Sequence, residues 1–154
     1  MFSVLFASTL LLFPSAVRPI APVSGSVIQR FVAPSCQRCA GHRGVTIDSS
    51  AGQPVRAVLP GVITFVGEVA GNSYVVELIS PGVKVTYGWL EISGDLEEGD
   101  VVEQGHFLGA AGERTYLGVR RGSVYVEPLR YLGLGWARLR GPGGVVVGLA
   151  GSAR

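Results

Sequence analysis

Short runs of β-branched and aromatic residues, separated by tight-turn residues, constrain the fold of this chain most strongly. Residues 55–58, 61–67 and 74–79 are rich in such side chains and are interrupted by glycine or Gly-Asn. Runs of this kind are typical of β-strands joined by tight turns. The 23 glycines and 9 prolines also interrupt the longer periods that a helical bundle needs. We therefore expect an all-β domain.

Further strands are expected around this central region. Residues 26–31 predict a first short strand, and residues 83–87, after a Pro-Gly turn, alternate apolar and polar side chains as a half-exposed strand does. Residues 97–109 predict an acidic turn, a short strand and a second turn. Together these segments predict a series of antiparallel hairpins.

The last part of the chain predicts a closing hairpin and a short helix. Residues 115–121 and 124–126 are the expected strands, joined at Gly122-Ser123. Residues 128–132 predict one helical turn, because proline is tolerated at the first helical position. The remaining chain is rich in glycine, a composition that does not build a core. We expect residues 134–154 to form a mobile tail.

The N-terminus predicts export. Residues 4–13 are an uncharged apolar run of signal-peptide length, shorter than the roughly 20 residues that span a bilayer. We expect a signal peptide at 1–16 with cleavage after Ala16, an extended proline-containing linker at 17–26, and no other membrane-spanning helix. Proline at position 14 and the absence of Lys or Arg before the run match a signal poorly. An uncleaved short anchor or a start codon further upstream are therefore alternatives.

Charge does not indicate a polyanionic partner. The net charge is +2, and the twelve arginines and Lys84 are scattered along the chain. Nucleic-acid binding usually needs a clustered basic patch. We expect no nucleic-acid partner.

The two cysteines, Cys36 and Cys39, predict a disulfide. In an exported protein, such a pair most simply staples the loop that precedes His42. A Cys-x-x-Cys-x-x-His run could instead supply three zinc ligands, although no second ligand pair accompanies it. A thioredoxin-like redox site would need a βαβ context, which the neighbouring proline and glycines do not provide.

Residues 41–48 (GHRGVTID), followed by 51–57 (AGQPVRA), resemble the signature of the lysostaphin/LytM-type zinc metallopeptidases, which are cell-wall peptidases. The resemblance extends from about residue 31 to residue 133. It implies a LytM-like domain at 27–133 with an antiparallel, sandwich- or barrel-like sheet. This fold, a duplicated hybrid motif, is related to that of lipoyl/biotinyl carriers, which share the pattern G-D-x-V-x-x-G-x-x-L-G of residues 99–109.

The resemblance also implies which residues occupy the zinc site. In the family, a histidine, an aspartate four residues later and the second histidine of a His-x-His pair hold zinc, while a histidine after Thr-Tyr-x assists the attacking water. His42 corresponds to the first ligand and Thr46 to the aspartate. Trp89 corresponds to the water-assisting histidine, and Arg114 and Tyr116 correspond to the His-x-His pair. Of these five positions, only His42 keeps the family's residue.

The replacements are poor substitutes for zinc ligands. The neutral hydroxyl of Thr46 binds zinc weakly compared with a carboxylate, indole in Trp89 has only a donor N–H, and Arg114 stays protonated and repels a cation. Asp48 lies two residues beyond Thr46 on the same strand face, about 6.6 Å away. His106, the other histidine, lies in the expected Gly-x-x-Leu turn, where we expect a surface or structural role. The sequence therefore predicts a catalytically inactive peptidase fold without a cofactor.

Binding is the function that such a domain could keep. We expect it to be secreted or associated with a bacterial cell envelope, and to bind peptidoglycan or regulate a cell-wall hydrolase. Aromatic rings can stack on sugars or peptide bonds, and arginine can pair with a carboxylate. An equal alternative is that these residues only fill the space of the former zinc site. The expected groove consists of His42, Thr46, Trp89, Arg114 and Tyr116.

Two other functions remain as alternatives. An active zinc endopeptidase that cleaves peptidoglycan peptides would need a rearranged ligand set, such as His42 with Cys36 and Cys39 or with Asp48. A lipoyl/biotinyl carrier would need an exposed lysine at a hairpin tip. Lys84 lies in an expected strand and lacks the usual flanking motif.

Overall fold

The structure, a computed structural model, describes residues 16–135. The expected signal peptide, except its last residue, and the expected tail from residue 136 onward lie outside the described residues. Within residues 16–135, no helix is long and apolar enough to cross a membrane.

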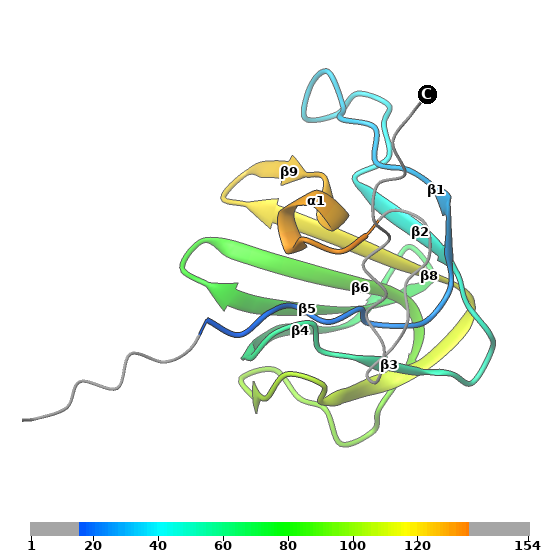
Figure 1. The fold of residues 1–154 in the computed structure, drawn as a ribbon, viewed down its shortest axis with the longest axis vertical. Helices are drawn as coiled ribbons and strands as arrows, with labels where there is room; N and C mark the ends of the chain where they lie inside the picture. Colours follow the sequence, from blue (N-terminus) through cyan, green and yellow to red (C-terminus); the bar gives the residue numbers. More distant parts are fainter. Residues whose placement is uncertain (1–15, 136–154) are drawn as a thin grey trace, which may run out of the picture.

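The described chain is an antiparallel β-sheet with one short helix (Figure 1). The strand order is β1-β2-β8-β6-β5-β4-β7, and β3 and β9 also pair with β8. The all-β prediction is confirmed. The elements are β1 (Ser26–Gln29), β2 (Gly44–Asp48), β3 (Pro54–Arg56), β4 (Gly61–Val69), β5 (Asn72–Ser80), β6 (Val83–Ile92), β7 (Val101–Val102), β8 (Phe107–Arg121), β9 (Val124–Val126) and α1 (Pro128–Leu132).

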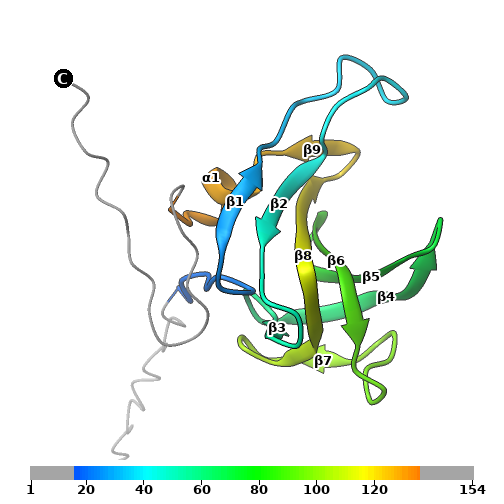
Figure 2. The same ribbon diagram turned by 90° about the vertical axis from the view of Figure 1, so that its right-hand side faces the viewer.

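Strand β8 holds the sheet together. It is 15 residues long and pairs with β2, β3, β6 and β9. The sequence predicted only its last part, residues 115–121, as a strand. Figure 2 shows β8 upright between β2 and β6, while β4 and β5 run across its direction. The sheet is therefore strongly curved, and one apolar cluster that includes Ile47, Tyr87 and Leu117 forms the core.

The segment 17–26, which we expected to be a linker, is part of the domain. Ala21 and Val23 are buried in the core. The backbone N–H of Ile20 donates to the Val58 carbonyl, and that of Arg56 donates to the Pro22 carbonyl. Apolar residues of this segment thus pack into the core while its backbone pairs with β3 and with the residues that follow β3.

Helix α1 forms at the predicted residues. The Glu127 side chain caps its N-terminus by accepting hydrogen bonds from the N–H groups of Leu129 and Arg130. Pro128 occupies the first turn, where a missing N–H costs nothing. Gly133 ends the helix with φ 66°, and Leu134 is then buried against the core. The domain therefore extends beyond the expected boundary at residue 133.

Candidate functional site

An open groove lies on the face of the sheet over β6 and β8. Its volume is about 720 Å³, which is in the range of ligand-binding clefts. We call it the aromatic groove. Its ring-bearing side chains come from β4, β5, β6, β8, β9 and the loop before β2: Phe65, Tyr74, Trp89, Tyr116, Tyr125 and His42.

A hydrogen-bonded chain connects His42, Thr46 and Gln29 at one side of this groove. The distance between His42 Nε2 and Thr46 Oγ1 is 3.1 Å, and the buried Thr46 hydroxyl donates to Gln29 Oε1 at 3.4 Å. Because the Thr46 hydroxyl donates its proton to Gln29, it can only accept a hydrogen bond from His42. The His42 Nε2 atom therefore carries the proton of a neutral ring. Burial lowers the pKa of His42. The imidazole is therefore neutral at pH 7, and its Nε2 is occupied by Thr46.

Tyr116 is the centre of an aromatic cluster. Its ring centroid lies 5.9 Å from that of His42, 6.3 Å from that of Tyr74 and 5.6 Å from that of Trp89. The contacts with His42 and Tyr74 are edge-to-face, the geometry that ring quadrupoles favour. Burial raises the pKa of the Tyr116 phenol to about 12. The phenol is therefore protonated at neutral pH.

Glycines make room for the Tyr116 ring. Gly44 and Gly118 are opposite each other on β2 and β8. A Cβ on Gly44 would lie 2.7 Å from the Tyr116 ring, and one on Gly118 would lie 2.7 Å from its hydroxyl. A Cβ on Gly88 would similarly meet the Tyr74 ring at 2.7 Å. Three neighbouring strands therefore carry glycine where two tyrosine rings lie flat on the backbone.

Trp89 enters the groove from an irregular point in β6. The register between β6 and β8 shifts between Gly88 and Leu90, and Trp89 has a φ of 65°. A non-glycine residue in this region costs of order 1–3 kcal/mol and is found mainly at functional sites. Bulges of this kind re-aim a side chain. Here the bulge directs the indole toward Tyr116.

The structure brings four of the five expected groove residues together. His42, Thr46 and Tyr116 meet between β2 and β8, where Thr46 and Tyr116 are register partners, and Trp89 reaches them from β6. Arg114 is exposed, lies opposite Asp48 and does not line the groove. His106 is on the surface.

Cys36 and Cys39 are joined by a disulfide in the loop before His42. Arg43 holds this loop, because its Nη2 donates to the carbonyls of Gln37 and Cys39 at 2.8 and 3.3 Å. The Arg43 guanidinium also lies over the Tyr125 ring, 5.6 Å from the centroid. The loop is thereby attached to β9 at the edge of the groove.

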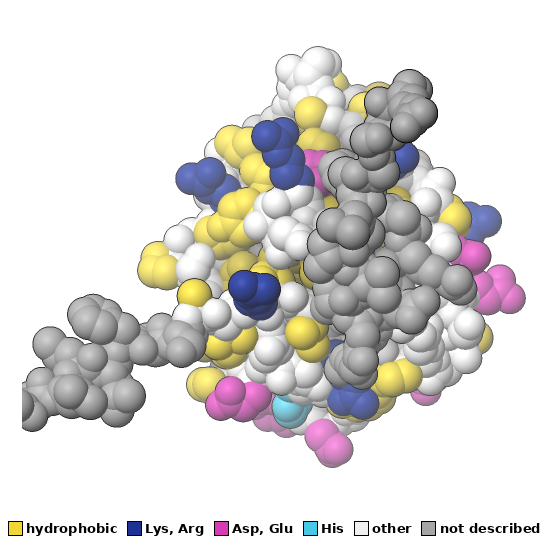
Figure 3. All heavy atoms as spheres, viewed as in Figure 1, with side chains coloured by type: hydrophobic (Ala, Val, Ile, Leu, Met, Phe, Trp, Pro, Cys, Tyr) yellow, Lys and Arg dark blue, Asp and Glu magenta, His cyan; other side chains and the backbone are white. Residues whose placement is uncertain are grey.

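Three cations in the groove were missed by the sequence reasoning. Lys84 and Arg120 are register partners on β6 and β8, and Arg43 lies beside them in the groove lining. They are far apart in the sequence, so only the strand register could have revealed the cluster. Figure 3 shows cationic side chains among hydrophobic ones on the side of the molecule where β9 lies, with acidic side chains mainly at the lower end and right-hand edge.

The donors in the groove do not fit a zinc ion. At the positions that the family resemblance assigns to zinc ligands, Thr46 offers a neutral hydroxyl and Tyr116 a protonated phenol, and indole offers no lone pair. The disulfide removes both thiolates from the rearranged ligand set. Within residues 16–135, no three His, Cys, Asp or Glu side chains are grouped so that they could hold a metal ion. A hydrolytic mechanism through zinc therefore has no support in these residues.

The fold and the altered site define a domain of the lysostaphin-type metallopeptidase class. The family model described as Peptidase family M23 matches residues 40–128, more than half of the chain. The chain therefore belongs to this family. No curated protein has a sequence that matches it.

Solved structures share the fold. Csd3 of Helicobacter pylori superposes with a TM-score of 0.66 at 22% identity, over 74% of this chain and 33% of Csd3. A chain of the SpoIIQ-SpoIIIAH pore forming complex has a TM-score of 0.63 at 20% identity, over 76% and 92% of the two chains. The catalytic domain of lysostaphin from Staphylococcus simulans has a TM-score of 0.59 at 18% identity, over 71% and 92%. This chain thus spans about a third of Csd3, and identities this low show the fold alone.

Proposed function

We propose that this protein is an exported member of family M23 that binds peptidoglycan peptides in the aromatic groove without hydrolysing them. The observation that carries the proposal is the position of the Tyr116 ring. It lies opposite Thr46 and packs edge-on against His42 and Tyr74. A flat apolar surface thus replaces a metal-ligand position.

The absence of hydrolysis follows from the acid–base chemistry of the same residues. Peptide hydrolysis needs an activated water and a group that accepts its proton. His42 is neutral, but its Nε2 is engaged with Thr46. Trp89 stands where a base would be needed, and its indole nitrogen only donates. Within residues 16–135, the groove therefore offers no zinc-ligand set, and the position of Trp89 offers no base.

Binding is supported by the shape and chemistry of the groove. Tyrosine and tryptophan side chains present large rigid surfaces that cost little conformational entropy on binding. Their faces stack on sugar rings and peptide planes, and their polar atoms remain available for hydrogen bonds. A groove lined by five aromatic side chains suits an extended, partly apolar chain such as a cell-wall peptide. The alternative partner is a cell-wall hydrolase that this domain would regulate.

A sedimentation assay on insoluble peptidoglycan tests the proposal. We expect the Trp89→Ala variant to lose at least about ten-fold in affinity, because an aromatic hot spot contributes 2 kcal/mol or more. Tyr131→Ala removes an aromatic side chain that is 41% exposed on α1, outside the groove, and should bind as the wild type does. Equal binding by all three proteins would show that the rings only fill space.

A second measurement separates binding from catalysis. The wild-type protein, supplied with zinc, should release no soluble peptides from the same peptidoglycan, while an active lysostaphin-type enzyme serves as the positive control. Release that disappears in the His42→Ala variant would contradict the proposal and restore the active-peptidase alternative.

A further inference from the structure

We propose that Lys84, Arg120 and Arg43 form an anion site at one end of the aromatic groove, which takes the terminal carboxylate of the bound peptide. The inference deepens the proposed function and rests on it. None of these three cations stands at a position that the family resemblance assigns to a zinc ligand (His42, Thr46 and Tyr116), although Arg43 directly follows His42 in the chain.

The strand register places Lys84 and Arg120 in one row with Tyr125, and the Arg43 guanidinium lies over the Tyr125 ring. Lys84 on β6 lies opposite Arg120 on β8, and Arg120 lies opposite Tyr125 on β9. Tyr116 is four residues before Arg120 on the same strand, about 13 Å at 3.3 Å per residue. The row therefore closes the end of the groove away from Trp89.

Like charges directly opposite each other destabilise a sheet. Lys84 and Arg120 are both half-buried, and neither has a hydrogen-bond or ion-pair partner among the described residues. Partial burial of a cation without a counter-charge costs free energy. A bound anion would offset both the repulsion between Lys84 and Arg120 and the cost of burying them.

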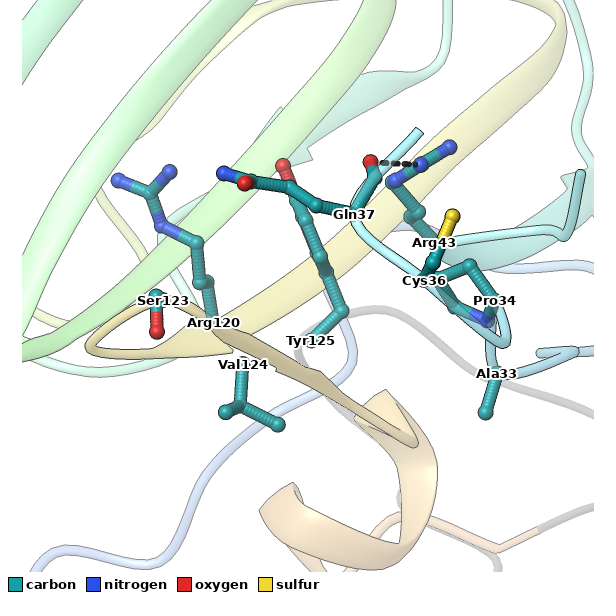
Figure 4. A pocket seen from close by; sticks show the side chains of 9 residues that line it. All are labelled: Ala33, Pro34, Cys36, Gln37, Arg43, Arg120, Ser123, Val124 and Tyr125. Carbon is teal, nitrogen blue, oxygen red and sulfur yellow. Dashed lines mark hydrogen bonds between the residues drawn. The ribbon is translucent and has the colours of Figure 1, made fainter. Parts of the chain in front are cut away.

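A second hollow meets the groove at this row. Its volume is about 630 Å³, and it shares Arg43, Arg120 and Tyr125 with the groove. Figure 4 shows Arg120 and Arg43 on opposite sides of Tyr125, with the Gln37 side chain extending from the disulfide loop toward Arg120. No Asp or Glu lines either hollow. The two hollows therefore present three cations to one space.

Arg43 is held in place for this role. Only its Nη2 donates to the disulfide loop, and guanidinium has five N–H donors in total. The remaining donors can reach a ligand while the loop and the Tyr125 ring fix the side chain. Fixed arginines bind carboxylates through paired, charge-assisted hydrogen bonds.

The chemistry favours a single carboxylate over a polyanion. Three cations at one end of a groove that is otherwise aromatic fit a chain with one charged end and a largely uncharged body. A polyphosphate or nucleic acid would need cations along its whole length. We therefore assign the end of the groove to the C-terminal carboxylate of a peptide.

Calorimetric titration of the full chain with two synthetic peptidoglycan stem peptides tests this assignment. The peptides are identical except that one has its terminal carboxylate converted to an amide. We expect the free acid to bind about ten-fold more tightly or better, since charge-assisted hydrogen bonds are roughly twice as strong as neutral ones. The Arg120→Gln variant should bind the acid as weakly as the amide and bind the amide unchanged.

Arg121→Gln is the matched control. Arg121 is the exposed neighbour of Arg120 on β8 and lines neither hollow. The Arg121→Gln variant should bind the acid as the wild type does.

If acid and amide bind equally and only Trp89→Ala weakens both, the groove binds peptides and the anion site is wrong. If neither peptide binds, the proposed function itself fails, and the anion site with it. If inorganic phosphate binds with dependence on Arg120 while acid and amide bind equally, the site is for phosphate and the carboxylate assignment is overturned.

Discussion

The Tyr87 hydroxyl donates a hydrogen bond of 2.6 Å to Glu77 Oε2 in the core and accepts one of 2.9 Å from the Val58 N–H. Neither Glu77 nor Tyr87 has exposed surface, and Glu77 Oε1 has no partner among the described residues. Burial raises the pKa of Glu77 to about 7, although the Tyr87 hydrogen bond acts in the opposite direction. The core therefore contains a carboxyl group that is largely protonated below neutral pH.

Because of the raised pKa of Glu77, we expect the free energy of unfolding to fall as the pH rises. The folded pKa of about 7 exceeds the value of 4.5 for a free glutamate, so the unfolded chain loses its proton first. The stabilisation is fully present below pH 4.5 and is lost between pH 4.5 and 7. The shift corresponds to about 3 kcal/mol. Urea unfolding between pH 4 and 8.5 measures it.

Glu77→Gln is the control for that measurement, because the amide keeps an acceptor for Tyr87 and does not titrate. The difference in unfolding free energy between wild type and variant should change across this pH window and level off above it. A difference that is independent of pH would show that Glu77 titrates normally.

Removing the Tyr87 hydroxyl should destabilise the core directly. The Tyr87→Phe substitution leaves the Val58 N–H and the Glu77 carboxyl without their shared partner, and each unsatisfied buried group costs about 1–3 kcal/mol. We expect a loss of roughly 2–4 kcal/mol in urea unfolding at pH 5. Tyr131→Phe removes a hydroxyl from a residue that is 41% exposed and should change stability little. Similar losses in both variants would contradict the role of this network.

The Tyr116 ring makes Gly118 intolerant of a side chain. A Cβ at this position would lie 2.7 Å from the Tyr116 hydroxyl, so Gly118→Ala should lose roughly 1–3 kcal/mol through overpacking. Combining it with Tyr116→Ala should recover part of this loss, which a double-mutant cycle measures. Gly94→Ala is the control, since nothing lies within 4 Å of its Cβ position. Additive effects of the two substitutions would mean that the ring is not the obstacle.

Strands could be predicted where glycine-containing turns separate them in the sequence. The hairpins formed by β4, β5 and β6 follow from β-branched alternation between glycine-containing turns. The first half of β8 could not be predicted, because Gly109 and Gly112 interrupt its pattern and its pairing comes from β3 and β6, which are distant in the sequence. The segment around Val23 resembled a linker because prolines dominate it, whereas its burial depends on a distant surface.

The candidate site was also predictable only in part, because some of its residues meet only through strand pairing. Resemblance to the peptidase family predicts His42, Thr46, Trp89 and Tyr116 as site residues from motif positions, and the structure brings these side chains together. The same resemblance assigns Arg114 to the groove, yet its side chain is exposed outside the groove. Lys84 and Arg120 meet through strand register, which no local motif reveals.

The register of β2 and β8 predicts that zinc binding can be restored. Thr46 and Tyr116 are directly opposite each other, and His42 Nε2 lies 3.1 Å from Thr46 Oγ1. Thr46→Asp combined with Tyr116→His would place a carboxylate and a second imidazole beside His42, the three-ligand set of a catalytic zinc site. The double variant should retain about one zinc per chain after dialysis, whereas the wild type should retain none.

Two further variants test whether the zinc is held by the restored ligands. Adding His42→Ala to the double variant should abolish zinc retention, which would show that the metal uses the restored ligands. The double variant should still release no peptides from peptidoglycan, because Trp89 supplies no base for the attacking water. Hydrolysis by the double variant would mean that the lost ligands alone account for inactivity. Zinc retention by the wild type, lost in His42→Ala, would mean that a ligand set outside these positions holds the metal.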